Sequence, residues 1–292
     1  MDEEKVLAER FEAHRRHLRG VAYRMLGSPT EADDAVQEAW LRLSRSDTNG
    51  VNNLAGWLTT VVARVCLDML RARKSRGEET LHANAPQLAA TEGASDPEQE
   101  MLLADSVGLA LLVVLETLTP AERIAFVLHD MFDLPFEAIA PVVGRSPIAV
   151  RQLASRARRR VCGAAAVPET ELGRQRRVVD AFLAASRSGD FNALVALLDP
   201  DIVLRADAAG VPIQIQGASA VATKALAYSR NARFAQPALV NGVVGVIVAP
   251  HGRLSVVLDF KIRDARIAEF DVITDPVRLR QLNLAVLGER SS

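Results

Sequence analysis

The sequence predicts a multidomain chain in which two all-α domains are followed by an α+β domain. Apolar side chains recur at helical spacing through residues 3–163, with polar or Gly- and Pro-containing breaks between the periodic segments. After residue 165, helical segments mix with short runs of alternating apolar and polar residues, which is typical of half-buried strands. A length of 292 residues and a hydrophobic content of 49% are enough for a core in each domain.

The first all-α domain is predicted over residues 1–76 as a bundle of three helices. An amphipathic helix over 3–26 ends at "GSPTEADD", where a second helix begins and runs to about residue 43. Ser28 suits the N-cap of that second helix and Pro29 suits its first turn. A third helix, expected over 54–73, follows the polar loop "SDTNGVNN".

The second all-α domain is predicted over residues 98–165, after a linker over 77–97 that lacks sustained periodicity. The segment "DPEQEMLLADSVGLALLVVLETL" is expected to form one helix. Thr119 as an N-cap and Pro120 in the first turn then start the next helix, "TPAERIAFVLHDMF".

A helix-turn-helix is predicted at the end of this domain. A short helix is expected over 135–143, and Gly144 allows the sharp turn that follows it. Ser146 then caps the last helix and Pro147 opens it. Two helices joined by a short turn that contains glycine are the pattern of DNA-binding helix-turn-helix proteins.

The last helix of this motif has one apolar face and one basic face. The residues expected to point inward are Val150, Ala154, Ala157 and Val161, and those expected to point outward are Arg151, Gln152, Ser155, Arg158 and Arg159. Residues 145–160 contain six basic side chains and no acid, although the net charge of the chain is −1. Residues 64–76 hold five basic side chains against Asp68. Both clusters predict binding to a polyanion, and Arg and Gln are side chains that read base edges.

The α+β domain is predicted over residues 174–292, after a linker over 166–173. Its clearest strand is "GRLSVVLDFKI", in which apolar and polar side chains alternate. We expect helices to cover one side of a curved antiparallel sheet, and the segment "DPVRLRQLNLAVL" to close the chain as a helix.

The cysteines and histidines predict no metal site. Cys66 and Cys162 lie far apart in helical patterns, so both are expected to be small buried residues. His14 and His17 have a spacing that can hold a metal, but no third ligand lies near them in the sequence. We expect no cofactor. The charged N-terminus and the absence of an apolar run of about 20 residues predict a cytoplasmic protein without a membrane partner.

Residues 5–163 resemble a group IV, extracytoplasmic-function (ECF) sigma factor of bacterial RNA polymerase. "AYRMLGSPTEADDAVQEAWLRL" and "LAGWLTTVVARVCLDMLRARK" resemble sigma region 2, and "LTPAERIAFVLHDMFDLPFEAIAPVVGRSPIAVRQLASRARRRV" resembles region 4. Residues 174–287 resemble the SnoaL-like branch of the cone-shaped NTF2-like fold, most clearly in "RSGDFNALVALLDPDIVLRAD". The group typified by mycobacterial sigma factor J carries such an extension; of its Trp-Leu-Pro-Glu-Pro linker, only Val167, Pro168 and Glu169 are similar here.

The resemblance implies a sigma factor, not an enzyme, that binds core RNA polymerase through the β′ clamp helices and the β flap and starts transcription at promoter DNA. The residues implied to contact the −35 element are Arg145, Ser146, Arg151, Gln152, Ser155, Arg156, Arg158 and Arg159. Those implied at the −10 element are Asn49, Asn52, Asn53, Arg64, Arg71, Arg73 and Lys74. Those implied to bind polymerase are Asp33, Asp34, Gln37 and Glu38. The C-terminal domain is expected to regulate activity in cis, with room for a small-molecule ligand.

Two other functions remain open at this point. A one-component regulator with a helix-turn-helix and a ligand-sensing domain would need no counterpart of sigma region 2. An isomerase or cyclase would leave the first 163 residues unexplained. For that enzyme, residues placed to face a cavity are Asp207, Asp259, Asp271, Phe182, Tyr228 and Phe234. Trp57 lies on a buried stripe, so we interpret it as a core residue in preference to a DNA contact.

Overall fold

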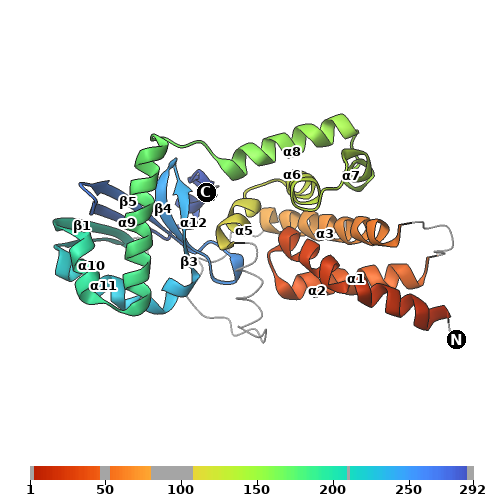
Figure 1. The fold of residues 1–292 in the computed structure, drawn as a ribbon, viewed down its shortest axis with the longest axis horizontal. Helices are drawn as coiled ribbons and strands as arrows, with labels where there is room; N and C mark the ends of the chain where they lie inside the picture. Colours follow the sequence, from red (N-terminus) through yellow and green to blue (C-terminus); the bar gives the residue numbers. More distant parts are fainter. Residues whose placement is uncertain (1–2, 47–52, 80–107, 209–210, 288–292) are drawn as a thin grey trace. The chain divides into compact units, whose positions relative to one another are not determined.

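The computed structural model describes residues 3–46, 53–79, 108–208 and 211–287 (Figure 1). The described chain forms two compact units. The first contains the described parts of 1–107 together with 115–158, and the second contains 108–114 together with the described parts of 159–292. Within the described ranges, no helix is both long and apolar enough to cross a membrane.

The first unit begins with three helices, as predicted. They are α1 (Glu3–Leu26), α2 (Pro29–Ser44) and α3 (Leu54–Glu79). Gly27 ends α1 with a φ of 74°, and the Ser28 hydroxyl accepts a hydrogen bond from the Glu31 N–H, so α2 starts where the sequence predicts. The helix α3 extends beyond the expected end near residue 73.

The helix-turn-helix follows in the same unit, except that the last turn of its final helix, from residue 159, belongs to the second unit. Its two helices are α7 (Phe136–Val143) and α8 (Pro147–Cys162), and the helix α6 (Pro120–Phe126) and the short π-helix η1 (Val127–Met131) precede them. Thr119 and Glu122 form a reciprocal capping box at the start of α6. Gly144 adopts a left-handed conformation with a φ of 71°, and the Ser146 hydroxyl accepts a hydrogen bond of 3.3 Å from the Ala149 N–H. The predicted turn and cap are therefore confirmed.

Residues 80–107, which include much of the single helix expected over 96–118, lie outside the described part. The helix α5 (Leu109–Glu116) begins directly after Gly108, whose φ of 73° is not helical, so the expected helix does not run unbroken through this residue. The helix α5 is apolar on all sides, which is the pattern of a buried helix. Its first part belongs to the second unit, where the Ala110 N–H donates a hydrogen bond of 3.2 Å to Gln236 Oε1.

The second unit contains a mixed sheet. Its strands are β1 (Leu198–Ala208), β2 (Val211–Gln216), β3 (Ala235–Val240), β4 (Val243–Val248), β5 (Val256–Arg263), β6 (Arg266–Ile273) and β7 (Leu284–Ala285). Over the described residues the order is β2-β1-β6-β5-β4-β3-β7. The expectation of an antiparallel sheet is wrong at one place, because β1 and β6 pair in parallel. The other pairs are antiparallel.

Helices cover one face of this sheet, as predicted. They are α9 (Glu169–Ser188), α10 (Phe191–Leu197) and α11 (Ala218–Ala227), and Figure 1 shows them beside the strands. The helix α9 already covers residues 169–173, part of the expected linker. The 3₁₀ turns η2 (Ser229–Phe234) and η3 (Pro250–Gly252) connect the remaining elements. Phe182, Phe260 and Phe270 fill the core between helices and sheet, with ring centroids 4.9–5.7 Å apart.

The end of the chain differs from the expected helix. The helix α12 (Pro276–Gln281) stops early, and Leu284 and Ala285 form the edge strand β7 on β3. Both residues are buried, so their apolar side chains gain more in the sheet than on an exposed helix. The Val286 N–H donates a hydrogen bond of 2.9 Å to the Val161 carbonyl.

The two cysteines lie in different environments. Cys66 is buried, as predicted, and burial raises the pKa of its thiol. Cys162 is exposed, so its predicted burial is wrong. It is the last residue of α8, where Val161 already supplies the buried side chain.

Candidate promoter and polymerase interface

The helix α8 separates its apolar and polar side chains as the sequence predicts. Its buried residues are Val150, Ala154, Ala157 and Val161, each at most 6% exposed. Its exposed residues include Arg151, Gln152, Ser155, Arg156, Arg158, Arg159 and Arg160, and Arg145 and Ser146 are exposed directly before it. One face of a single helix therefore presents the donors that read guanine and adenine edges, together with cations for phosphates.

Two of the arginines on α8 are oriented by other side chains. Arg158 forms an ion pair with Asp130, and its Nε lies 2.7 Å from Asp130 Oδ1. The guanidinium carbon of Arg151 lies 5.3 Å from the centre of the Phe136 ring on α7, in a cation–π contact. Asp130 was not among the predicted site residues, because it is 28 positions from Arg158 and outside any basic cluster.

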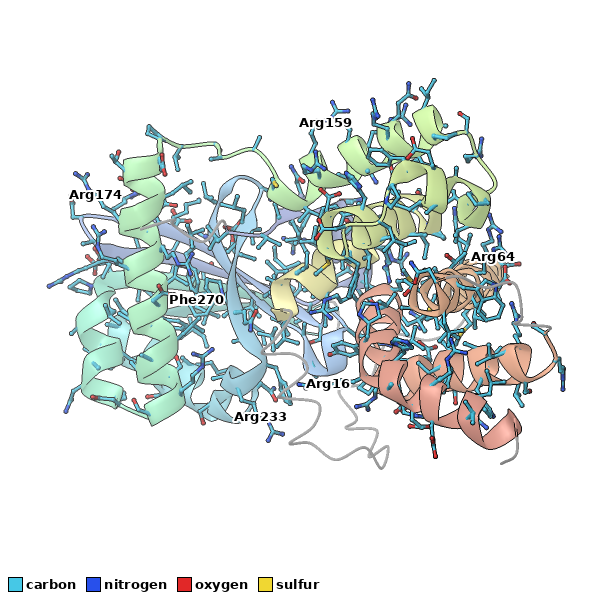
Figure 2. The ribbon with its side chains drawn as sticks, turned by 45° about the vertical axis from the view of Figure 1, so that its right-hand side comes forward. Arg16, Arg64, Arg159, Arg174, Arg233 and Phe270 are labelled. Atoms are coloured by element: carbon cyan, nitrogen blue, oxygen red, sulfur yellow. The ribbon has the colours of Figure 1, made fainter. Side chains whose placement is uncertain are left out.

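The predicted −10 residues on α3 differ in exposure and in their contacts. Arg64, Arg71 and Lys74 are exposed on α3, and Figure 2 shows Arg64 there. Arg73 instead forms an ion pair with Glu31, and its Nη1 donates a hydrogen bond of 3.3 Å to the Leu26 carbonyl. Arg73 thus joins α3 to the start of α2 and the end of α1.

The residues before α3 are only partly described. Asn49 and Asn52 lie outside the described residues. Asn53 is exposed, and its Oδ1 accepts a hydrogen bond of 3.0 Å from the Gly56 N–H, so this side chain caps α3. Trp57 is half-buried rather than fully part of the core.

The acidic face of α2 has two paired and two unpaired side chains. Asp33 Oδ1 accepts a hydrogen bond of 2.7 Å from Arg19 Nε on α1, and Glu38 pairs with Arg42 one turn later. Asp34 and Gln37 are exposed, and no side chain of the described residues binds them. Asp34 and Gln37 are therefore the members of the predicted set that are available to a partner.

The C-terminal domain does not bring the proposed acids and aromatic residues to one cavity. Phe182 is 3% exposed and packs against Phe260 and Phe270, and Figure 2 shows Phe270 inside the domain. Phe234 packs at the edge of the same core, whereas Tyr228 is 56% exposed.

The three aspartates lie on the opposite face of the sheet from this core, because they alternate with its apolar residues. Asp207 pairs with Arg278 at 2.9 Å. Asp259 and Asp271 stand opposite each other on β5 and β6, and burial together with Asp271 raises the pKa of Asp259. In the described residues, no three His, Cys, Asp or Glu side chains form a metal-binding group.

A helical bundle with an acidic helix face, followed by a helix-turn-helix with a basic exposed face, is the arrangement expected of a sigma-70-type transcription initiation factor. Residues 10–76 match the family described as Sigma-70 region 2, and residues 108–161 match Sigma-70, region 4. Over 292 residues, 99% of this chain and 100% of the relative, the sequence is 34% identical to the "Probable ECF RNA polymerase sigma factor SigI" of Mycobacterium tuberculosis.

A second relative has a higher sequence identity to this chain, over a shorter part of it. It is the "ECF RNA polymerase sigma factor SigJ" of Mycobacterium tuberculosis, 43% identical over 202 residues, which are 68% of this chain and 64% of the relative. The crystal structure of that factor covers 93% of this chain and 98% of its own, with 32% identity and a TM-score of 0.45. This chain belongs to the family of ECF RNA polymerase sigma factors. As a sigma factor, it binds core RNA polymerase and promoter DNA.

Proposed function

We propose that α8 reads the −35 element of the promoter and that α3 with the segment before it holds the −10 element. In this proposal Arg151, Gln152 and Ser155 contact bases, while Arg145, Ser146, Arg156, Arg158 and Arg159 lie nearer phosphates. Asn49, Asn52, Asn53, Arg64, Arg71, Arg73 and Lys74 serve the −10 element. The β′ clamp helices bind the face of α2 that carries Asp33, Asp34, Gln37 and Glu38. In this proposal the chain works in the cytoplasm, where RNA polymerase acts, and its membership of the sigma-factor family supports that location.

The observation that carries the proposal is the division of α8 into two faces. Four small or branched apolar residues bury one side, so they fix which side chains remain exposed. The exposed side holds the arginine and glutamine residues in the first half of the helix, where helix-turn-helix proteins contact base edges. An alternative one-component regulator would bind DNA without polymerase, and it would not need α1 to α3.

The experiment is transcription in vitro with core polymerase and the full chain, followed by binding titrations on promoter variants. Arg151→Ala should weaken binding by about 1–3 kcal/mol at one base pair and relax the preference there. Arg156→Ala should weaken binding on all promoters alike. Arg174→Ala removes an exposed arginine from α9 and serves as the matched control. Equal losses on every promoter for Arg151→Ala would contradict its role in base reading.

We further propose that the C-terminal domain regulates the sigma regions in cis. Aromatic rings fill the core of this domain. This packing favours regulation through contact with the sigma regions over regulation by a large ligand bound inside the domain. The Ala166 N–H donates a hydrogen bond of 2.8 Å to the Gly242 carbonyl, so the segment after α8 is bound to the β3–β4 turn. Gly242→Ala should therefore change transcription at saturating sigma factor, whereas Gly189→Ala should not. Unchanged output for both variants, with the sigma factor still folded, would argue against regulation through this turn.

A further inference from the structure

Ile148 on α8 is an apolar side chain that the fold leaves in solvent. It is 72% exposed, more than any other large hydrophobic residue in the described part of the chain. The next most exposed are Val277 at 59% and Tyr228 at 56%. An exposed aliphatic residue is ordinary on a protein surface when it stands alone among unrelated side chains. Ile148 instead lies in the first turn of the helix that carries the DNA-reading face.

The core of the helix-turn-helix does not need this side chain. Val150, Ala154 and Ala157 already bury the inner face of α8, and each is at most 1% exposed. The turn before the helix is fixed by Gly144 and by the Ser146 cap. Ile148 therefore contributes little to the stability of the helix-turn-helix, and we look for its role in what the exposed face of α8 contacts.

Helix geometry places Ile148 among the residues proposed to read bases. Arg151, Gln152 and Ser155 follow it at three, four and seven positions, and at 3.6 residues per turn all four lie within an arc of about 100°. Ile148 is the member nearest the start of the helix, and it is the N-terminal residues of this helix that contact base edges in helix-turn-helix complexes. The hydrogen-bonding groups on this arc leave one kind of base feature unread.

That unread feature is the C5-methyl group of thymine. In the major groove, bases present donors and acceptors that Arg, Gln and Ser bind, and the thymine methyl is the apolar group that an aliphatic side chain contacts. We infer that Ile148 packs against a thymine methyl within the −35 element and so selects a T·A pair next to the pairs read by Arg151 and Gln152. This inference rests on the proposed role of α8 at the −35 element.

The test uses holoenzyme made from core polymerase and the full chain, and a promoter duplex at which it starts RNA synthesis. Each thymine of the −35 element, on either strand, is replaced in turn by deoxyuridine, which removes only the methyl group. One such replacement should weaken binding of the unchanged protein about threefold to tenfold. Ile148→Ala should weaken binding to the original duplex by a similar factor, and it should show no further loss at that deoxyuridine. Ile148→Val keeps a branched aliphatic side chain and should retain the sensitivity.

Val277→Ala is the matched control, because it removes another exposed aliphatic side chain from a helix outside the helix-turn-helix. It should bind every duplex as the unchanged protein does. The inference fails if no deoxyuridine weakens binding, or if Ile148→Ala remains as sensitive as the unchanged protein. Full base-pair substitutions in the same element separate this failure from a failure of the proposed function. If they weaken binding while deoxyuridine does not, α8 still reads the element and only the role of Ile148 is wrong. If neither has an effect, the −35 assignment itself is wrong.

Discussion

The Nη1 atom of Arg123 donates a hydrogen bond of 2.8 Å to the backbone carbonyl of Met25, although the two residues are 98 positions apart. The Nε atom of the same guanidinium donates a hydrogen bond of 2.7 Å to the Leu115 carbonyl. Both acceptors lie in the last turns of their helices, α1 and α5, where carbonyls lack partners within the helix. Arg123 is 5% exposed, and burial lowers its pKa to about 10, so it remains charged at neutral pH.

Replacing Arg123 should destabilise the first unit strongly. Arg123→Met keeps much of the volume but removes the side-chain donor to the Met25 carbonyl and leaves the Leu115 carbonyl with the Leu118 N–H as its donor. We expect a loss of about 2–4 kcal/mol in the free energy of unfolding. Urea denaturation of the full chain measures this loss. Arg42→Ala is the control, because it removes an exposed arginine from an ion pair within α2 and should cost at most about 0.5 kcal/mol. Similar losses for the two variants would contradict the structural role of Arg123.

Gly242 should tolerate no side chain, because both its conformation and its surroundings exclude one. Its φ is 86°, and an added Cβ would lie 2.7 Å from the Ala166 nitrogen and 2.9 Å from the Ala164 oxygen. Gly242→Ala should therefore lower the free energy of unfolding by about 2–4 kcal/mol, from left-handed strain and the displaced contact together. Thermal unfolding of the full chain is the measurement.

Gly189 provides the control for backbone strain alone. It also has a positive φ, 73°, but nothing lies within 4 Å of an added Cβ. Gly189→Ala should therefore cost only about 1 kcal/mol. If the two alanine variants lose the same stability, the contact between Gly242 and the segment after α8 contributes nothing.

The parts of the fold that were predicted from sequence depend on neighbours along the chain. The Ser28, Thr119 and Ser146 caps involve side chains and N–H groups three positions apart, so a short window of sequence contains the whole interaction. The buried and exposed faces of α8 follow from helical periodicity in the same way. For these elements the local preference and the final packing agree.

The features that were missed depend on residues far apart. The parallel pairing of β1 with β6 and the edge strand β7 are set by which strands meet in the sheet, and no local pattern records this. Phe182 has the apolar character of a pocket residue, but its packing on Phe260 and Phe270 decides that it fills a core. Arg73 and Arg158 look alike in a basic cluster, and only their acidic partners distinguish them from free cations.

Asp259 should destabilise the C-terminal domain at neutral pH. Burial and the facing carboxylate of Asp271 raise its pKa above the ordinary value of 3.8, so the folded state binds this proton more tightly than the unfolded state. The ionised Asp259 side chain therefore lowers the free energy of unfolding. This loss is absent at pH values below 3.8 and develops as the pH rises through the elevated pKa of Asp259. Asp259→Asn should therefore raise the free energy of unfolding by about 0.5–1 kcal/mol at pH 7.5 and have little effect at pH 3.5.

Urea denaturation at the two pH values tests this sign. Asp201→Asn removes an exposed carboxylate from β1 and should change stability little at either pH. A gain for Asp259→Asn that is equal at both pH values would show that the facing carboxylates are not its source.

The ion pair of Arg158 with Asp130 should reduce the contribution of Arg158 to DNA binding. Arg156 and Arg158 both belong to the predicted phosphate-contacting set, but within the described residues only Arg158 has an acidic partner. A phosphate must compete with Asp130 for that guanidinium, whereas it meets Arg156 free of an ion pair. Affinity falls as salt rises, and Arg156→Ala should make the slope of log affinity against log salt shallower by about 1. Arg158→Ala should make the same slope shallower by less than about 1.

Asp130→Asn should remove the difference between Arg158 and Arg156 in their contribution to DNA binding, and it completes the test. It removes the competing charge while keeping the size of the side chain, so Arg158 becomes available to phosphate. Holoenzyme carrying Asp130→Asn should bind promoter duplex more tightly at low salt and show a salt slope steeper by up to about 1. Adding Arg158→Ala to that variant should remove the gain, because the released cation is then absent. If Asp130→Asn leaves both affinity and slope unchanged while Arg158→Ala weakens binding as much as Arg156→Ala does, the ion pair does not persist when the protein binds DNA.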